Sequence, residues 1–190
     1  MEKTFIEDQE FQGVDFNAQP LKIGNYEHCI FRNCDLSNGD LSEMIFVDCE
    51  FFDCDLSMVR VDKTAFRNAS FQSCKLLGIR FDDANDLLLS MRFEECHLSF
   101  SSFYQKPLPS TTFRNCLLQE VDFTEADLSE AVFEHCDLSG AVFEHTNLES
   151  ADFRTSGNYR LDPEKNRIRK ARFSLDGAIG LLHKYEIVIE

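Results

Sequence analysis

Eight cysteines are the side chains of this sequence with the most obvious capacity for chemistry, because thiolates bind zinc and form disulfides. C-x2-C pairs are the usual zinc signature, and the closest pairs here are C-x4-C, at 29/34 and 49/54. Every cysteine instead stands two residues before a large apolar residue, and in many other repeats that slot holds Ala, Val, Ser or Thr. The exchange predicts thiols that pack as small apolar groups, with metal binding and disulfides as the alternatives. The cysteines are Cys29, Cys34, Cys49, Cys54, Cys74, Cys96, Cys116 and Cys136.

Other catalytic and cofactor patterns are missing from the sequence. The five histidines show no H-E-x-x-H spacing, and the glycines form neither G-x-G-x-x-G nor G-x-x-x-x-G-K-[ST]. Carboxylates are abundant, but nothing predicts a cleft that would raise the pKa of one above that of its neighbour. We therefore expect a protein that is not an enzyme and that has no cofactor and no bound metal.

The carboxylates give the chain a net charge of -15, and they are unevenly distributed. Residues 1–160 hold 29 acids and 13 bases, whereas residues 161–190 hold 5 acids and 6 bases. An acidic surface repels nucleic acids and anionic membranes and attracts basic surfaces. We expect no direct nucleic-acid binding and no membrane association.

The densest acidic segment is 115–153, which contains ten Asp and Glu and no Lys or Arg. Its linear charge density is of the same order as that of duplex DNA, which bears one charge per ~1.7 Å. This density favours a surface that binds a basic partner, and the alternative is an acidic surface that serves solubility alone. The outward-pointing members predicted to bind the partner are Glu120, Glu125, Glu130, Glu134, Glu144 and Glu149.

The elements that position these residues are set by a period of five. A large apolar residue occupies every fifth position from Phe11 to Phe81 and again from Leu88 to Phe153. Neither an α-helix nor a flat strand has this period. Each unit reads small–polar–large–x–x, and Phe11, Phe31, Phe51 and Phe71 recur every twenty residues. Four sides of five residues predict an all-β solenoid with a square coil, in which these phenylalanines stack.

Two segments interrupt the regular units. Phe81 and Leu88 are seven residues apart, so the frame slips by two within 82–87, which we expect to form a small bulge. The Pro-rich segment 104–110 keeps the frame, but Lys106 occupies a small inward slot, and we expect the segment to bow outward. Either segment is a candidate functional loop or a packing irregularity.

The sequence changes character near its end, so we divide the chain into a repeat region, 1–157, and a C-terminal capping or dimerisation module, 158–190. Ser174 or Asp176 is expected to cap a short helix over 178–183, which is followed by a strand over 186–190. Several apolar residues there should cover the open end of the coil or a second copy of the chain. They are Leu181, Leu182, Tyr185, Ile187 and Ile189.

The residues carry no signal for secretion or membrane insertion. The segment that starts at Met1 lacks a charged region followed by an apolar one, and no stretch of about eighteen apolar residues occurs. We therefore expect a cytoplasmic protein with reduced thiols.

The repeat A/C-D/N-L/F-x-x resembles that of pentapeptide-repeat proteins over most of the chain, as in Ala126-Asp127-Leu128. That resemblance implies a right-handed quadrilateral β-helix. Residues 171–189, with a Leu-Leu pair before an Ile/Val segment, look like the C-terminal module of the quinolone-resistance (Qnr-like and MfpA-like) branch. In that branch the module forms a homodimer, and the proteins bind DNA gyrase or topoisomerase IV by imitating DNA. The resemblance thus implies a type II topoisomerase as partner and an effect on fluoroquinolone action, and the alternative is a scaffolding protein with another protein ligand.

Overall fold

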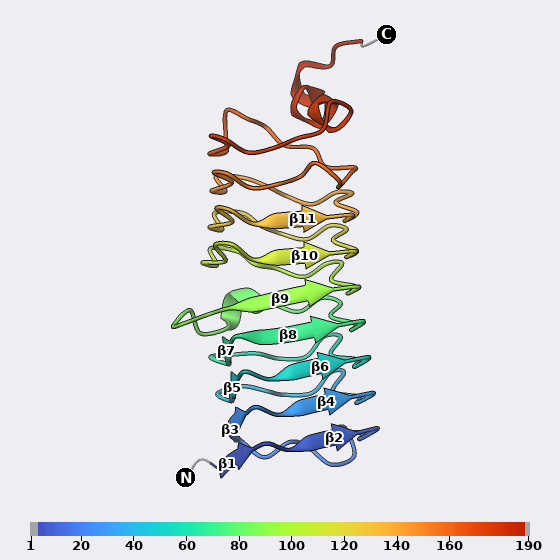
Figure 1. The fold of residues 1–190 in the computed structure, drawn as a ribbon, viewed down its shortest axis with the longest axis vertical. Coiled ribbons are helices and arrows are strands. Elements are labelled where there is room, and N and C mark those ends of the chain that lie inside the picture. The colour runs from blue at the N-terminus through green and yellow to red at the C-terminus, as the bar shows by residue number, and fades with distance from the viewer. Residues whose placement is uncertain (1–3, 189–190) are drawn as a thin grey trace.

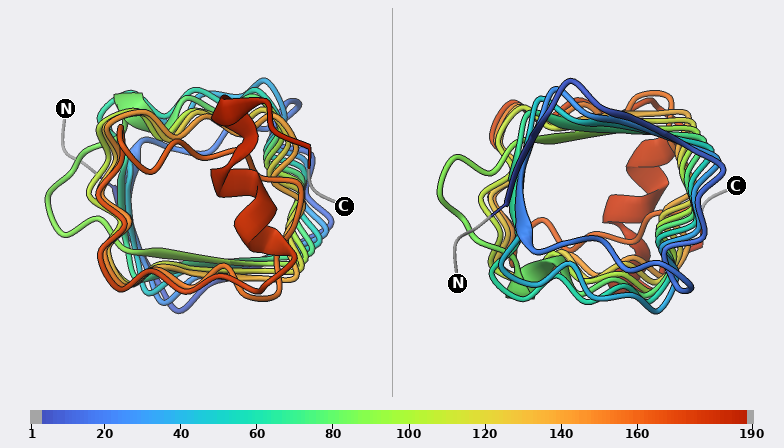
Figure 2. Two further views of the ribbon diagram at one scale, coloured as in Figure 1. Left: turned by 90° about the horizontal axis from the view of Figure 1, so that it is seen from above. Right: turned by 90° about the horizontal axis from the view of Figure 1, so that it is seen from below.

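The five-residue period winds the chain into a coil with four sides. In the computed structural model, which describes residues 4–188, the coils stack along one axis, with the N-terminus at one end and the C-terminus at the other (Figure 1). Seen along this axis, the coil has a four-cornered outline (Figure 2). The predicted all-β solenoid is confirmed.

Two parallel sheets form two of the sides. The larger has seven strands in the order β11-β10-β9-β8-β6-β4-β2, and the smaller has four in the order β1-β3-β5-β7. Isolated parallel bridges, such as Asp35 to Asp55 and Ser102 to Asp122, connect successive coils on the other two sides. The strands of the larger sheet are β2 (Glu10–Gln12), β4 (Ile30–Arg32), β6 (Glu50–Phe52), β8 (Ala69–Gln72), β9 (Met91–Glu94), β10 (Thr112–Arg114) and β11 (Val132–Glu134). Those of the smaller are β1 (Thr4–Glu7), β3 (Gly24–Glu27), β5 (Ile45–Val47) and β7 (Ala65–Arg67).

The core is a set of stacked columns, one for each side. Phe31 lies directly beneath Phe51, with ring centroids 4.7 Å apart and planes inclined by 6°, and Phe51 stacks on Phe71 at 4.8 Å. Rings of adjacent sides meet edge to face, as Phe46 and Phe51 do at 5.6 Å and 68°. The stacking predicted from the twenty-residue spacing is confirmed, and it combines both ring geometries that aromatic pairs prefer.

The cysteines line the inner wall beside these columns. All eight are free and buried, with exposed fractions between 0 and 3%. Cys54 donates its S–H to the carbonyl oxygen of Phe31 at 3.4 Å, which satisfies the thiol inside the core. Burial raises the pKa of the Cys49 thiol to about 12, so this group stays protonated. The prediction that the cysteines pack as small core residues is confirmed.

The corners of the coil have left-handed backbone conformation. The residue two after a buried centre has a positive φ, for example 50° at Asn33 and 64° at Gly78. Gly and Asn adopt this conformation readily, whereas most side chains are disfavoured there by about 1–2 kcal/mol. On the coil after Leu118, three successive corners are occupied by Glu120, Glu125 and Glu130, with φ of 54°, 58° and 60°.

The two-residue slip leaves the main column intact. Phe71 pairs with Phe93 rather than with a residue twenty positions later, and their rings stack at 5.3 Å. The extra residues protrude from one side after the short 3-10 helix η1 (Phe81–Asp83), as the loop beside β9 shows (Figure 1). The prediction that Leu88 is a buried centre is wrong, because it is 69% exposed, and Leu89 packs against the core instead.

Lys106 does not make its segment bow outward, which corrects the second expectation. Leu108 is buried and Pro107 bridges to Asp127, so the coil runs through this segment without a bulge. The Lys106 side chain is buried and its Nζ donates to the carbonyl oxygen of Ala84 at 2.7 Å and to Asp86 Oδ1 at 2.5 Å. Because a buried ammonium group needs such partners, Lys106 anchors the protruding loop to the next coil.

The coil geometry continues beyond residue 157. Arg172 bridges to Asp152, and Phe173 stacks on Phe153 with ring centroids 5.4 Å apart. The expected helix consists of two 3-10 turns, η2 (Gly177–Leu181) and η3 (His183–Tyr185), and Ser174 Oγ accepts the N–H of Gly177 at 3.0 Å. The predicted strand is wrong over 186–188, which have no strand pairing, and 189–190 lie outside the described residues. No helix among residues 4–188 has the length and apolar character needed to cross a bilayer.

Candidate acidic interface

The six predicted glutamates fall into two structural groups. Glu120, Glu125 and Glu130 occupy successive corners and are exposed. The other three follow a buried phenylalanine or leucine directly and are half-buried. They are Glu134, Glu144 and Glu149.

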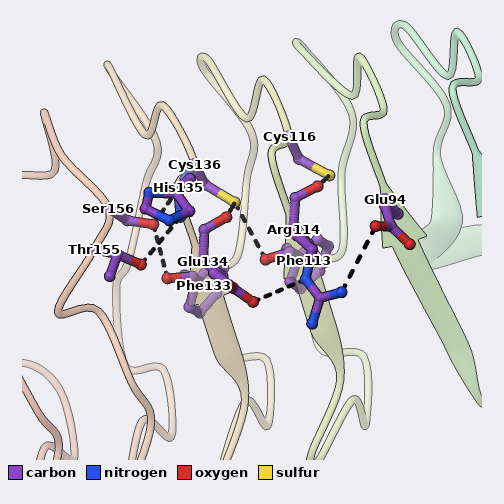
Figure 3. A network of polar contacts seen from close by, with 10 residues as sticks. All are labelled: Glu94, Phe113, Arg114, Cys116, Phe133, Glu134, His135, Cys136, Thr155 and Ser156. Carbon is purple, nitrogen blue, oxygen red and sulfur yellow. Dashed lines mark hydrogen bonds and ion pairs between the residues drawn. The ribbon is translucent and has the colours of Figure 1, made fainter.

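The half-buried group is neutralised by cations of neighbouring coils. Arg114 of β10 lies between Glu134 of β11, at 2.8 Å, and Glu94 of β9, at 3.6 Å (Figure 3). Lys165 and Arg167 pair with Glu144 and Glu149 at 3.0 and 2.9 Å. These ion pairs join residues about one coil apart in the sequence, so the acidic segment 115–153 receives its counter-charges from outside its own limits.

Within the described residues, the hydrogen-bond partners of the corner glutamates are neutral side chains. Gln105 donates to Glu125 at 2.7 Å and Ser110 donates to Glu130 at 3.2 Å. Within residues 4–188, Glu120 forms no ion pair, and its side chain lies beside Gly140 of the next coil. Three carboxylates without a cationic partner among the described residues are therefore available at the surface.

Aspartates between these corners add to the same surface. Asp122 and Asp127 accept backbone N–H groups two residues later, at 2.9 and 3.0 Å, so they hold the turns. The Ser139 hydroxyl lowers the pKa of Asp137 to about 2, with help from Asn158 and Gln119. None of these three aspartates forms an ion pair within the described part of the chain.

Six carboxylates thus form what we call the acidic belt, around three sides of one coil. The fourth side carries Arg114 with its two partners, Glu94 and Glu134. The structure therefore separates the predicted glutamates instead of aligning them in one stripe. Arg114 and Glu134 are twenty residues apart, the same spacing as in the phenylalanine column. This spacing was the sequence signal that could have identified their ion pair. The belt comprises Glu120, Asp122, Glu125, Asp127, Glu130 and Asp137.

The predicted C-terminal contact residues divide in the same way. Leu181 is half-buried against the core, whereas Leu182, Tyr185 and Ile187 are 38, 52 and 56% exposed. Ile189 lies outside the described residues. The C-terminal segment also exposes three apolar residues that were not predicted as contacts, Leu175, Ile179 and Val188.

Comparison with known sequences and structures agrees with this geometry. The profile described as a pentapeptide repeat region matches residues 24–103, and the one described as pentapeptide repeats (8 copies) matches 110–154. The chain belongs to the pentapeptide-repeat family. No curated protein sequence gives a significant match.

Two solved pentapeptide-repeat structures cover nearly the same length. A trypsin-treated variant of QnrB1, a plasmid-mediated fluoroquinolone resistance protein, is 21% identical with a TM-score of 0.50, over 99% of this chain and 98% of that chain. HetL, involved in heterocyst differentiation regulation in the cyanobacterium Nostoc sp. strain PCC 7120, is 16% identical with a TM-score of 0.50, over 92 and 86%. At these identities the likeness concerns the fold alone.

The acidic belt gives this pentapeptide-repeat surface the means to attract a basic partner. Within residues 4–188, no three His, Cys, Asp or Glu side chains are grouped so that they could hold a metal ion. The belt carboxylates are exposed or half-buried on the outside of the coil, where a basic partner can contact them.

Proposed function

We propose that this chain is a non-enzymatic binding protein whose acidic belt occupies the DNA-binding groove of a type II topoisomerase, as a mimic of duplex DNA. The observation that supports this most directly is the belt itself. Its carboxylates surround three sides of a narrow rod and lack cationic partners in the described chain. The fold shared with QnrB1, a fluoroquinolone resistance protein, is the reason to choose gyrase or topoisomerase IV as the partner.

Charge density supports mimicry. One coil rises ~4.8 Å, the spacing of neighbouring strands, so the six belt charges lie within about one strand spacing along the axis. Duplex DNA bears about three charges over the same length. A partner that contacts half of the belt therefore meets a charge density similar to that of DNA. Attraction of this kind also speeds association and weakens as salt is added.

The proposal includes a cytoplasmic homodimer joined through the C-terminal apolar residues. Leu182, Tyr185 and Ile187 form an exposed group at one end of the rod, and such a group favours contact with another apolar surface. Two rods of about 35 Å joined end to end would be about 70 Å long. The dimer would then present two belts to one partner.

A gyrase supercoiling assay tests the proposal. The dimer at micromolar concentration should inhibit supercoiling or change its inhibition by a fluoroquinolone. Changing the corner residues Glu120, Glu125 and Glu130 to Gln should weaken the effect at least tenfold, since it removes three unpaired charges. The absence of any effect of the unaltered protein would contradict the proposal.

The chain offers a matched control for that variant. Changing Glu134, Glu144 and Glu149 to Gln removes the same number of charges, but these charges are already paired with Arg114, Lys165 and Arg167. We expect this variant to keep most of its effect on gyrase. Equal losses in the two variants would mean that net charge, rather than the belt, is what the enzyme recognises.

A scaffolding role is the second candidate, and the protruding loop favours it. Leu87 and Leu88 are 64 and 69% exposed on a loop that Lys106 fixes from within. A fixed loop loses little conformational entropy on binding. In a pull-down, a scaffold that binds through this loop should keep its partner when the corner glutamates are changed, and should lose it when Leu87 and Leu88 are changed to Ser.

A further inference from the structure

The first coil exposes side chains whose counterparts in the next coil are buried. Phe11 and Leu21 are half-buried, whereas Phe31 and Leu41, in the same columns one coil later, are 0 and 2% exposed. Phe5 is 59% exposed beside them. These residues line a hollow of about 550 Å³ at the N-terminal mouth of the coil, which no helix crosses (Figure 2, right).

Among residues 4–188, backbone N–H groups at the lower edge of this coil have no partner. Ile30, Glu50 and Ser70 occupy one position of successive coils, and each donates its N–H to the preceding coil at 2.9, 3.0 and 3.0 Å. Glu10 holds this position in the first coil, and the described chain has no coil beneath it. The N–H of Asp15 also has no coil beneath it in the described chain. The N–H of Asp35, its equivalent in the next coil, donates to the preceding coil at 2.9 Å. The mouth therefore presents an open strand edge beside an apolar hollow.

The rim of this edge is acidic. Glu7, Asp8 and Asp15 are exposed there, and Lys22 is the basic side chain lining the same hollow. An occupant with outward-pointing Lys or Arg would be attracted to this rim. A second copy of the same end would bring like charges together.

The size of the mouth also argues against a second copy. A side of five residues spans about 16 Å at ~3.3 Å per residue, which gives a face of about 270 Å². Stable interfaces bury about 800 Å² on each partner. An extended segment needs less area, because main-chain hydrogen bonds along the open edge supply part of its affinity.

We propose that the N-terminal mouth is a strand-addition site for an extended segment of a partner protein. The segment continues the coil, places large apolar side chains into the hollow and directs Lys or Arg side chains toward the rim. This site is at the mouth of the first coil, and it depends neither on the acidic belt nor on the C-terminal contact.

The probe for this site is a synthetic peptide with the sequence of residues 24–43, in which Glu27, Asp35, Asp40 and Glu43 are replaced by Lys. This peptide keeps the apolar pattern of one coil and reverses its charge. A scrambled peptide of the same composition keeps the charge and loses the pattern. Both are labelled with a fluorophore and titrated with the full chain under reducing conditions.

We expect the patterned peptide to bind at least tenfold more tightly than the scrambled one. Phe5→Glu should weaken binding at least tenfold, whereas Phe100→Glu should change it less than twofold. Phe100 is a matched control because it is 62% exposed, against 59% for Phe5, and lies on a corner far from the mouth. Hydrogen exchange of the Glu10 and Asp15 amides should slow when the peptide binds.

The site would be overturned by equal binding of the two peptides, by no binding of the patterned peptide at millimolar concentration, or by equal losses in the Phe5 and Phe100 variants. Protection of amides elsewhere without protection of Glu10 would also overturn it. Circular dichroism of both variants checks that they remain folded, since each replaces a side chain that is already exposed.

Discussion

The two ends of the coil finish the same columns in different ways. At the N-terminal end, Phe11 has a stacked ring on one side only, Phe31 at 4.8 Å. At the C-terminal end, η2 lies across the mouth (Figure 2, left), and Tyr159 is only 3% exposed. Gly180 makes this cover possible, because a Cβ there would lie 2.4 Å from the carbonyl oxygen of Tyr159. The repeats therefore do not determine how the coil ends; the flanking segments do.

The covered end is also fixed by charges. Lys184 Nζ contacts Asp162 and Glu164, each at 2.7 Å, and Tyr185 donates to Glu164 at 3.1 Å. These bonds tie η3 to the last coil. At the N-terminal end, the Arg32–Glu10 pair at 2.9 Å joins two coils of the rod but holds no cover. The comparison predicts that the ends differ in stability, in pH response and in tolerance of substitution.

Removing the cover should have the largest effect. A chain that ends at Ser174 exposes Tyr159 and lacks Leu181, and each such side chain contributes about 1.5–3 kcal/mol when buried. We expect the free energy of unfolding to fall by about 3–5 kcal/mol in urea titrations. Light scattering of the same chain should give a monomer. An unchanged unfolding midpoint would mean that the two ends are equivalent after all.

Substituting one phenylalanine near each end should give a smaller difference. Phe153→Ala empties a site that is 0% exposed between the rings of Phe133 and Phe173, and should cost about 3–5 kcal/mol. Phe11→Ala removes a half-buried ring with one stacked neighbour. It should lower the free energy of unfolding by about 2 kcal/mol less than Phe153→Ala does. Chemical denaturation of the two variants measures this difference. Equal costs would show that the N-terminal mouth is covered in solution.

Acid should weaken the contacts that hold the covered end. The Lys184 ammonium lowers the pKa of Asp162 and of Glu164 below their ordinary values. Because the folded pKa is the lower one, this stabilisation is complete above about pH 4.5 and is lost as the pH falls through the folded values. Hydrogen exchange of Gly180 and Leu182 should therefore accelerate at pH 3 relative to amides of β4. A Lys184→Met variant should show fast exchange already at pH 7.

The smallest effect is expected at the bare end. Phe5→Ser replaces a side chain that is 59% exposed, and should change the free energy of unfolding by less than about 0.5 kcal/mol. Thermal unfolding measures this change. A large loss would mean that Phe5 is packed in solution, which would contradict an open mouth.

Much of the rod could be predicted from the sequence, because the same pattern of inward and outward residues recurs in many units. The phenylalanine column and the cysteine slots each recur, so one exception does not obscure them. The slip was harder, because the sequence offers both Leu88 and Leu89 as the inward residue, and only the path of the loop decides between them. Lys106 was misjudged because its buried partners, Ala84 and Asp86, belong to that loop.

The candidate site was less predictable for a related reason. Composition identified the acidic segment, but whether Glu144 is free depends on Lys165, one coil away. A count of charges along the chain therefore overestimates the charge available to a partner. A better estimate leaves out each carboxylate that has a Lys or Arg about twenty residues away in the sequence. The C-terminal cover follows no repeat, so its 3-10 turns could not be read from the periodicity of the rod.

The tolerance of the coil for the slip has a consequence for how such a rod could change its length. Two extra residues were absorbed on one side, and Phe93 still stacks on Phe71. Insertions smaller than a full circuit are therefore expelled as surface loops, whereas a duplication of twenty residues would lengthen the rod by ~4.8 Å and leave both mouths unaltered. The length of the rod can therefore evolve in steps of one coil, and each step leaves the structures of both ends unchanged.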